Sequence, residues 1–376
     1  MPRHSKRSSA PSSALPGERA LITAIRARAG GSFRHVPLGI GDDCAVLRPD
    51  PGTEIVVTTD LSLEQVHFRR DWHTPESAGH RCLARGLSDL AAMGAHPLAA
   101  FLSLSIPGEF TTPDPPAPPA GRNLRARSVS WIDRFLDGLL LLGAKHHVPL
   151  AGGDTAQSPQ FDELGRRQSG LAAADIVLIG QVKRGQALLR SGARPGNVIY
   201  VTGALGGSAA ELLALGRAPE HFAELTKSPA KGTASHPHLF PEPRLAVGSE
   251  LAAKKWARAA IDISDGLSTD LRHLCEASGV AAEIDECALP VHPLALQAEH
   301  DGWIPSALGL ALHGGEDYEL LFTARQNAPV PRSIAGIDIH PIGMIRERRP
   351  RQPMVVMNTP SGKRVPVEAG GWEHFA

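Results

Sequence analysis

The sequence carries no excess charge of either sign, which excludes partners recognised mainly by charge. Thirty-nine acidic residues balance thirty-nine basic residues, so the formal net charge at pH 7 is zero. The basic field that draws a protein to nucleic acid is therefore missing. No apolar run approaches the ~20 residues that a membrane helix needs. We expect neither nucleic acid nor a membrane among the partners.

The sequence also lacks an export signal and has little cysteine. A short basic stretch, Arg3 to Arg7, opens the chain, but no apolar segment follows it. We expect residues 1–17 to form a disordered basic leader. The four cysteines make no CxxC pair and have no zinc-finger spacing. We expect reduced thiols in small buried side chains and a cytoplasmic location.

The familiar motifs of ATP binding and of zinc hydrolysis are missing too. There is no GxxxxGK[ST] loop, no protein-kinase glycine-rich loop with HRD and DFG partners, and no HExxH pair. If this chain binds ATP, a P-loop does not hold the nucleotide.

The length and residue pattern predict two domains of mixed α/β (α+β) class. A chain of 376 residues fits two domains of ordinary size, and 42% hydrophobic content supports sizeable cores. We place an N-terminal domain at 18–185 and a C-terminal domain at 186–376. Alternating elements in both halves favour this class. The Pro-rich stretch 108–127 and the polar stretch 158–169 read as loop insertions.

Hydrophobic periodicity locates the main elements. Helices are expected at 21–29, 76–95, 131–147 and 209–215, and a further helix after residue 265. Strands are expected at 37–47, 55–60, 98–106, 171–182, 198–202, 259–263 and 318–323. In the helix over 76–95, Leu83, Leu87, Leu90 and Ala91 form an apolar stripe.

Six acidic motifs are the most informative feature that is present. They read Gly41-Asp42-Asp43, Thr58-Thr59-Asp60, Ser88-Asp89, Gly152-Gly153-Asp154, Asp262-Ile263-Ser264-Asp265-Gly266 and Gly314-Gly315-Glu316-Asp317. Most follow an apolar run, so their carboxylates are expected to gather at strand ends. Two unit charges ~4 Å apart repel by ~4 kcal/mol at an effective dielectric of ~20. Hard oxygen ligands suit Mg²⁺, which usually brings a polyphosphate.

Each motif taken alone has an ordinary structural explanation. Ser264 or Asp265 could simply cap the helix that follows, and the Gly152-Gly153-Asp154 run could be a tight turn. His67 could be a packing residue or a substrate contact, and Arg190 a solvated turn residue or a phosphate contact. Trp372 could close a core or stack on a planar substrate.

Taken together, the motifs resemble those of the thiamine-monophosphate kinase family. GIGDDCAVL, TTD followed by VHF, LSDLAAMGA-P, GGDT, RSGA-PG, YVTG, DISDGL-DL and GGEDYEL-F occur in the family's order, from about residue 18 to the C-terminal GGW-HF. The family is part of the aminoimidazole-ribonucleotide synthetase-like superfamily. The resemblance implies transfer of the γ-phosphoryl group of ATP to thiamine monophosphate, giving thiamine diphosphate. It also implies a homodimer formed through the N-terminal sheet, and an active site in the cleft between the domains.

The resemblance assigns roles to the motif residues and leaves no acid–base catalyst, because the acceptor phosphate is already ionised. Several Mg²⁺ ions would be held by Asp43, Thr58, Thr59, Asp60, Asp89, Asp154, Asp262 and Asp265. ATP would contact Gly153, Asp154, Arg190 and Ser264. Thiamine monophosphate would contact His67, Glu316 and Trp372. Asp42 and Asp317 receive no role.

Three alternatives stay open at this point. The chain could be another ATP-using enzyme of the superfamily, acting on a formylglycinamidine ribonucleotide or on selenide. It could be a non-enzymatic protein that binds nucleotide or thiamine phosphate, although binding alone would not need so many acids. It could also be a structural α/β protein with acidic helix caps, which six motifs in one order make improbable.

Overall fold

The computed structural model describes residues 18–31, 33–111, 130–159, 161, 164–166, 170–218 and 236–372. The predicted leader and most of the stretch 108–127 lie outside these residues, as do several positions of the stretch 158–169. Among the described residues, no helix is both long and apolar enough to cross a bilayer.

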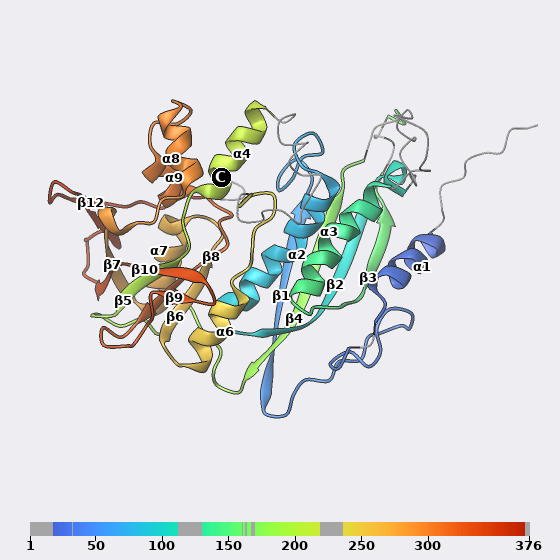
Figure 1. Cartoon of the computed structure of the whole chain (residues 1–376), viewed down its shortest axis with the longest axis horizontal. Helices are drawn as coiled ribbons and strands as arrows, with labels where there is room; N and C mark the ends of the chain where they lie inside the picture. Colours follow the sequence, from blue (N-terminus) through green and yellow to red (C-terminus); the bar gives the residue numbers. More distant parts are fainter. Residues whose placement is uncertain are drawn as a thin grey trace, which may run out of the picture.

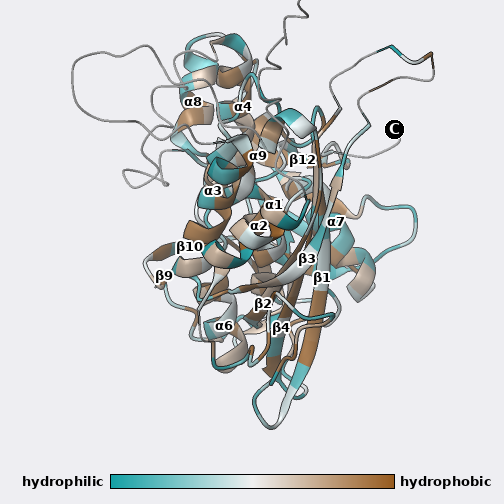
Figure 2. Cartoon of the chain, turned by 90° about the vertical axis from the view of Figure 1, so that its right-hand side faces the viewer, coloured by the Kyte–Doolittle hydropathy of each residue, from teal (hydrophilic) through white to brown (hydrophobic). Residues whose placement is uncertain are grey.

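The N-terminal half forms a four-stranded sheet with its helices on one side (Figures 1 and 2). The strand order is β1-β4-β2-β3, and only β2 and β3 run parallel. The elements are α1 (Glu18–Ala29), β1 (Thr53–Leu63), α2 (Pro75–Ala92), β2 (His96–Ile106), η1 (Gly108–Thr111), α3 (Trp131–Lys145), β3 (Leu150–Gln157) and β4 (Ala173–Lys183).

The C-terminal half is built on a larger sheet of order β12-β11-β7-β10-β5-β8-β6, with β9 paired to β10. Its elements are β5 (Val198–Thr202), α4 (Gly207–Arg217), α6 (Leu245–Ala253), β6 (Ala257–Ile263), α7 (Leu267–Ser278), β7 (Val280–Asp285), η3 (Glu286–Ala288), α8 (Pro293–His300), α9 (Ala307–His313), β8 (Glu319–Ala324), β9 (Ser333–Ile334), β10 (Ile337–Glu347), β11 (Val355–Asn358) and β12 (Arg364–Pro366). The two sheets with their helices confirm the predicted mixed α/β class.

Helix α2 runs through the middle of the molecule, between the two sheets (Figure 1). Its start is well defined, because Thr74 accepts a hydrogen bond from the Ser77 N–H and Pro75 occupies the first turn. The predicted apolar stripe is confirmed, since Leu83, Leu87, Leu90 and Ala91 are all buried. The helix packs on α3, β1 and β4, and also on α6 and β6 of the other half.

Helices α2 and α3 cross at two glycines. A Cβ atom on Gly79 would lie 1.9 Å from the carbonyl oxygen of Phe135, and one on Gly138 would lie 1.9 Å from that of Glu76. Only glycine permits the two backbones to come this close. The hydrophobic core around α2 continues into the C-terminal sheet through Phe322. The two halves therefore share one core across α2.

The strand expected over 37–47 is wrong. The described backbone there makes only isolated bridges, with Leu38 antiparallel to Val46 and Ile40 beside Asp42. The chain reverses at Gly41, whose φ is 124°, and the Asp42 carboxylate accepts the N–H of Asp43. A glycine with positive φ, followed by a turn in which a side chain accepts a backbone N–H, ends a strand. The apolar pattern alone did not reveal this turn.

Candidate active site

A cavity of about 240 Å³ lies where α2 meets the C-terminal sheet, and we call it the central cavity. Eight of the predicted site residues line it, and they come from both halves of the chain. They are Asp60, His67, Asp89, Asp262, Ser264, Asp265, Glu316 and Trp372. Asp60 belongs to β1, Asp89 to α2 and Asp262 to β6, so the fold brings together two acids, Asp60 and Asp262, that are 202 positions apart in the sequence.

Three carboxylates in this cavity have raised pKa values, mainly because they are buried. Burial and, to a smaller extent, the charge of Asp89 raise the pKa of Asp262 to about 7. The pKa of Asp89 is raised by burial, although its contact with Thr58 and the charge of Arg190 oppose the rise. Burial also raises the pKa of Asp60, against the effect of Arg85. Buried acids in this state are stabilised by a proton or by a cation.

Two short hydrogen bonds fix these acids on their elements. Ser88 Oγ on α2 donates to Asp262 Oδ2 at 2.7 Å, which ties the helix to strand β6. Thr58 Oγ1 donates to Asp89 Oδ2 at 2.5 Å, which ties α2 to strand β1. Neither contact uses the second oxygen of the carboxylate.

Arg85 is a member of the site that the sequence analysis missed. It lines the central cavity, and its Nη2 lies 2.6 Å from Asp60 Oδ1 while its Nε lies 3.1 Å from Oδ2. A paired guanidinium thus balances one acid of the cluster. Its place four residues before Asp89 on α2 is the signal that could have revealed it.

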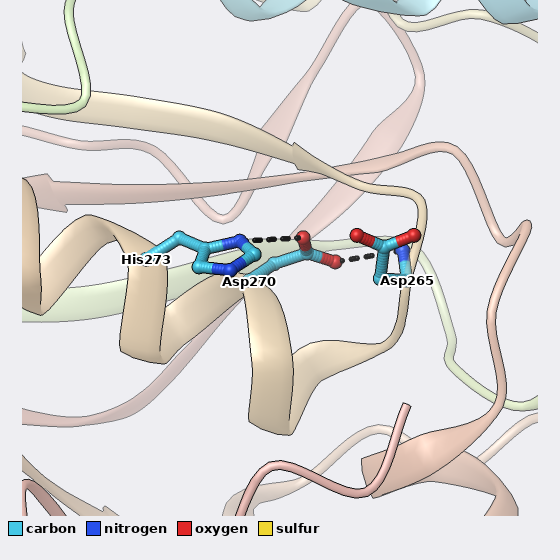
Figure 3. Close-up of side chains that lie close together, drawn as sticks. All are labelled: Asp265, Asp270 and His273. Carbon is cyan, nitrogen blue, oxygen red and sulfur yellow. Dashed lines mark hydrogen bonds and ion pairs between the residues drawn. The ribbon is translucent and has the colours of Figure 1, made fainter. Parts of the chain in front are cut away.

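The turn between β6 and α7 is shaped by Asp270, which is 2% exposed. Its Oδ2 accepts the backbone N–H groups of residues 264, 265 and 266, each at 3.1 Å. Figure 3 shows Asp270 between His273 and the backbone of Asp265. The expected cap by Ser264 or Asp265 is wrong, because Gly266 occupies the N-cap and makes no side-chain cap bond.

Asp265, Asp270 and His273 have ligand atoms within 4.8 Å of one another, as a metal site would require. One oxygen of Asp270 is nevertheless committed to three backbone N–H groups, which is the work of a structural support. Asp270 therefore orients the turn that presents the Asp265 carboxylate to the central cavity.

The turn at residues 314–318 is strained, and contacts from both halves hold it. Glu316 has a φ of 65° and Tyr318 a φ of 51°. Arg81, 2% exposed on α2, places its Nη2 2.6 Å from Glu316 Oε1. Burial alone would raise the pKa of Glu316, but Arg81 and Arg85 outweigh it, and the pKa is lowered. Glu316 is therefore a carboxylate at neutral pH, in a conformation of the kind that accumulates at functional sites.

Asp317, which had no predicted role, supports the same turn. Its carboxylate accepts the N–H of Gly206 at 2.7 Å and of Ser208 at 3.1 Å, at the start of α4. Burial raises its pKa to about 7. Its contacts are structural.

Four predicted residues lie elsewhere. Asp43, Gly153 and Asp154 line a second cavity, of about 640 Å³, between α1, the 39–45 loop and strand β3. Gly153, with a φ of 148°, has a packing reason, since a Cβ there would lie 1.9 Å from the Leu102 carbonyl oxygen. The hydroxyl of Thr59 lies 3.5 Å from Asp175, on the opposite face of β1 from Thr58.

Two of the predicted residues, Arg190 and Trp372, are exposed to solvent. Arg190 is exposed and outside the lining, although its charge lowers the pKa of both Asp89 and Asp262. Trp372 is 58% exposed and lines both the central cavity and an adjoining one of about 700 Å³. That adjoining cavity includes Trp72, Leu212 and Leu310, so Trp372 stands between an acidic and an apolar space.

Each half of the chain matches the model of a known protein family. The family model for the N-terminal domain of AIR synthase related proteins matches residues 41–182, and that for their C-terminal domain matches residues 194–326. The thiamine-monophosphate kinase of Bacillus subtilis (strain 168) is 33% identical over 345 residues, which cover 90% of this chain and 94% of that protein.

Two solved structures are similar over most of their length. The thiamine-monophosphate kinase of Stenotrophomonas maltophilia K279a has a TM-score of 0.69 at 34% identity, covering 91% of this chain and 96% of its own. AaThiL complexed with AMPPCP and TMP has a TM-score of 0.65 at 27% identity, covering 96% and 97%. The fold is thus that of the AIR synthase related class. Within that class, the chain belongs to the thiamine-monophosphate kinase family.

The raised pKa of Asp262 predicts how the stability of the ligand-free protein depends on pH. An unperturbed Asp titrates near 3.8, and Asp262 at about 7. The folded chain binds this proton more tightly, so the free energy of unfolding falls as the pH rises from about 4 to about 7. Asp262→Asn removes this penalty. The free energy of unfolding of the variant, measured relative to that of wild type, should be on the order of 1–3 kcal/mol larger at pH 8 than at pH 5.

Thermal unfolding in EDTA at the two pH values measures this difference. An equal difference in stability between Asp262→Asn and wild type at pH 5 and at pH 8 would show that the folded protein does not disfavour the charged form of Asp262.

Proposed function

We propose that this chain catalyses the transfer of the γ-phosphoryl group of ATP to thiamine monophosphate, giving ADP and thiamine diphosphate, the last step of thiamine diphosphate synthesis. The observation that carries the proposal is the cluster of Asp60, Asp89 and Asp262 between two halves of a family member. We place the reaction in the cytoplasm, as the sequence suggests.

The acids of the central cavity fit Mg²⁺. All offer hard oxygen ligands, and raised pKa values such as those of Asp60, Asp89 and Asp262 are expected of the acids of an empty cation-binding site. Thr58, Asp60, Asp89, Asp262 and Asp265 would hold the ions. When bound, Mg²⁺ would neutralise the crowded phosphates. Asp43, Thr59 and Asp154, which lie apart, are proposed as further ligands on the basis of the family motifs.

The two ends of thiamine monophosphate have opposite charges, and the site offers a partner for each. A carboxylate attracts the positively charged thiazolium ring and repels phosphate, so Glu316 would face the ring. Trp372 and His67 would contact the same substrate from the cavity wall. Gly153, Asp154, Arg190 and Ser264 are proposed to contact ATP.

The acceptor is an ionised phosphate oxygen, so the reaction needs no general base. The residues of the chain would bind and align the two phosphates, and the transfer would be direct and in line. We therefore expect inversion of configuration at a chiral γ-phosphate. Net retention, measured on the thiamine diphosphate formed, would indicate a covalent phospho-enzyme and contradict direct transfer.

The exposed face of the four-stranded sheet supports the proposed homodimer. Ile55, Val57 and Leu61 alternate along β1, and their exposed fractions are 47%, 59% and 50%. Figure 2 shows α2 and α3 on the other side of this sheet. Large apolar side chains in one exposed patch favour a protein contact, and a second copy of the chain would cover it.

The activity is tested by incubating the protein with ATP, Mg²⁺ and thiamine monophosphate and measuring thiamine diphosphate. Asp60→Asn, Asp89→Asn and Asp262→Asn should each lower kcat by about 100-fold or more, because a neutral amide holds a cation poorly. Asp301→Asn, at the exposed end of α8, is the matched control. Wild-type turnover by the three variants would contradict the metal role, and ATP turnover on another acceptor would move the assignment within the superfamily.

The dimer is tested by light scattering after size-exclusion chromatography. Wild type should have the mass of two chains. Val57→Lys should shift it toward one chain, because burying a lysine in an apolar interface is costly. A monomeric wild-type protein would contradict the proposed assembly.

A further inference from the structure

Two buried histidines beside the central cavity have no part in the reaction proposed above. His73, 5% exposed, comes just before α2, and His238, 1% exposed, lies in the segment that leads to α6. Their Nε2 atoms are 3.0 Å apart. His238 also lines the central cavity. This contact therefore links a residue of the cavity wall to a residue 165 positions away.

Both rings are neutral at pH 7. Burial, together with the charge of Arg81, lowers the pKa of His73 to about 3 and lowers that of His238 well below its usual value. A neutral imidazole has one N–H and one bare nitrogen. Between the two Nε2 atoms one ring must therefore donate and the other accept, so the tautomer of one ring fixes that of the other.

The backbone of Arg69 sets the direction. His73 Nδ1 lies 3.1 Å from the Arg69 nitrogen and 3.2 Å from its carbonyl oxygen. That oxygen already accepts the N–H groups of Trp72 and His73, at 3.2 and 2.8 Å. His73 Nδ1 therefore accepts from the Arg69 N–H, and the hydrogen of His73 is on Nε2. It follows that His238 accepts at Nε2 and carries its hydrogen on Nδ1.

The Nδ1–H of His238 faces two groups of the central cavity. Ser208 Oγ lies 3.0 Å away and Glu316 Oε2 lies 3.5 Å away. Arg81 Nη1 donates one hydrogen to the His238 carbonyl oxygen, and its second hydrogen is near the same Nδ1 at 3.3 Å. This contact is longer than the one from the Arg69 N–H to His73 Nδ1, at 3.1 Å, that sets the direction. Arg81 Nη2 holds the other oxygen of Glu316. Arg81 thus holds one oxygen of Glu316, and His238 Nδ1 lies beside the other.

We propose that His73 and His238 are positioning residues, forming a one-way donor chain from the Arg69 N–H that orients the Glu316 carboxylate and the Ser208 hydroxyl toward thiamine monophosphate. The inference rests on the proposed function, because Glu316 is the residue given to that substrate. Neither histidine is among the residues assigned to ATP or to Mg²⁺, so the chain is expected to act on binding of the acceptor.

Two variants of His73 separate the chain from simple packing. The amide nitrogen of Gln takes the place of Nε2 and can still donate to His238, whereas the shorter Asn reaches only the place of Nδ1. His73→Gln should keep the KM for thiamine monophosphate within about threefold of wild type. His73→Asn should raise it by about tenfold, the equivalent of one lost hydrogen bond, with the KM for ATP unchanged.

His80 supplies the matched control. It is equally buried on α2, and its Nε2 donates to the Pro241 carbonyl oxygen at 2.8 Å, so it holds the same connecting segment without touching Glu316. His80→Leu should lower the melting temperature and leave the KM for thiamine monophosphate at its wild-type value. Equal KM values for His73→Gln and His73→Asn, or a raised KM for His80→Leu, would overturn the proposal.

The tautomers themselves can be read in the wild-type protein without any turnover. ¹⁵N NMR of histidine-labelled protein, assigned with the His73→Gln variant, should show His73 protonated on Nε2 and His238 on Nδ1. The reverse pair, or a charged ring, would overturn the donor chain. If NMR shows the expected tautomers but the protein does not phosphorylate thiamine monophosphate, the proposed function is refuted. The chain of hydrogen bonds is then still supported.

Discussion

The burial of α2 between two sheets is the constraint on which the rest of the structure depends. A helix enclosed on both sides can expose few polar groups, yet α2 carries Arg81, Arg85, Ser88 and Asp89. Each of these needs a partner, because an unpaired polar group in such a place costs several kcal/mol. The partners come from both halves, with Thr58 and Asp60 on one side and Asp262 and Glu316 on the other.

The same constraint explains why the site is acidic and still folds. The ion pair of Arg85 with Asp60 and that of Arg81 with Glu316 offset part of the repulsion, and the hydroxyls of Ser88 and Thr58 hold Asp262 and Asp89. What is left is a group of carboxylates with raised pKa values, a state that a cation relieves. The strained turn at Glu316 is kept in place by Arg81 and Asp317, and the turn before α7 is kept in place by Asp270.

Sequence patterns predicted the parts of this arrangement that depend on local spacing. The apolar stripe of α2 and the strand before Asp262 followed from periodicity, and the acids were visible as motifs. Arg85 could have been found, since it lies one helical turn before Asp89. The cap of α7 by Ser264 or Asp265 was predicted wrongly, because the Asp270 carboxylate, inside the helix, accepts the backbone N–H groups of this turn instead. His238 could not be predicted, since it lies in a segment without periodicity and its partner His73 is 165 positions away.

The central claim is that α2 holds three acids together in readiness for a cation, and proton release on Mg²⁺ binding tests it most directly. Titration calorimetry at pH 7 in two buffers of different ionisation heat counts the protons released. With a pKa of about 7, Asp262 is partly protonated in the ligand-free protein. We therefore predict that Mg²⁺ releases protons from the wild type and that Asp262→Asn loses this release. Binding without proton release, or equal release from the variant, would contradict the account.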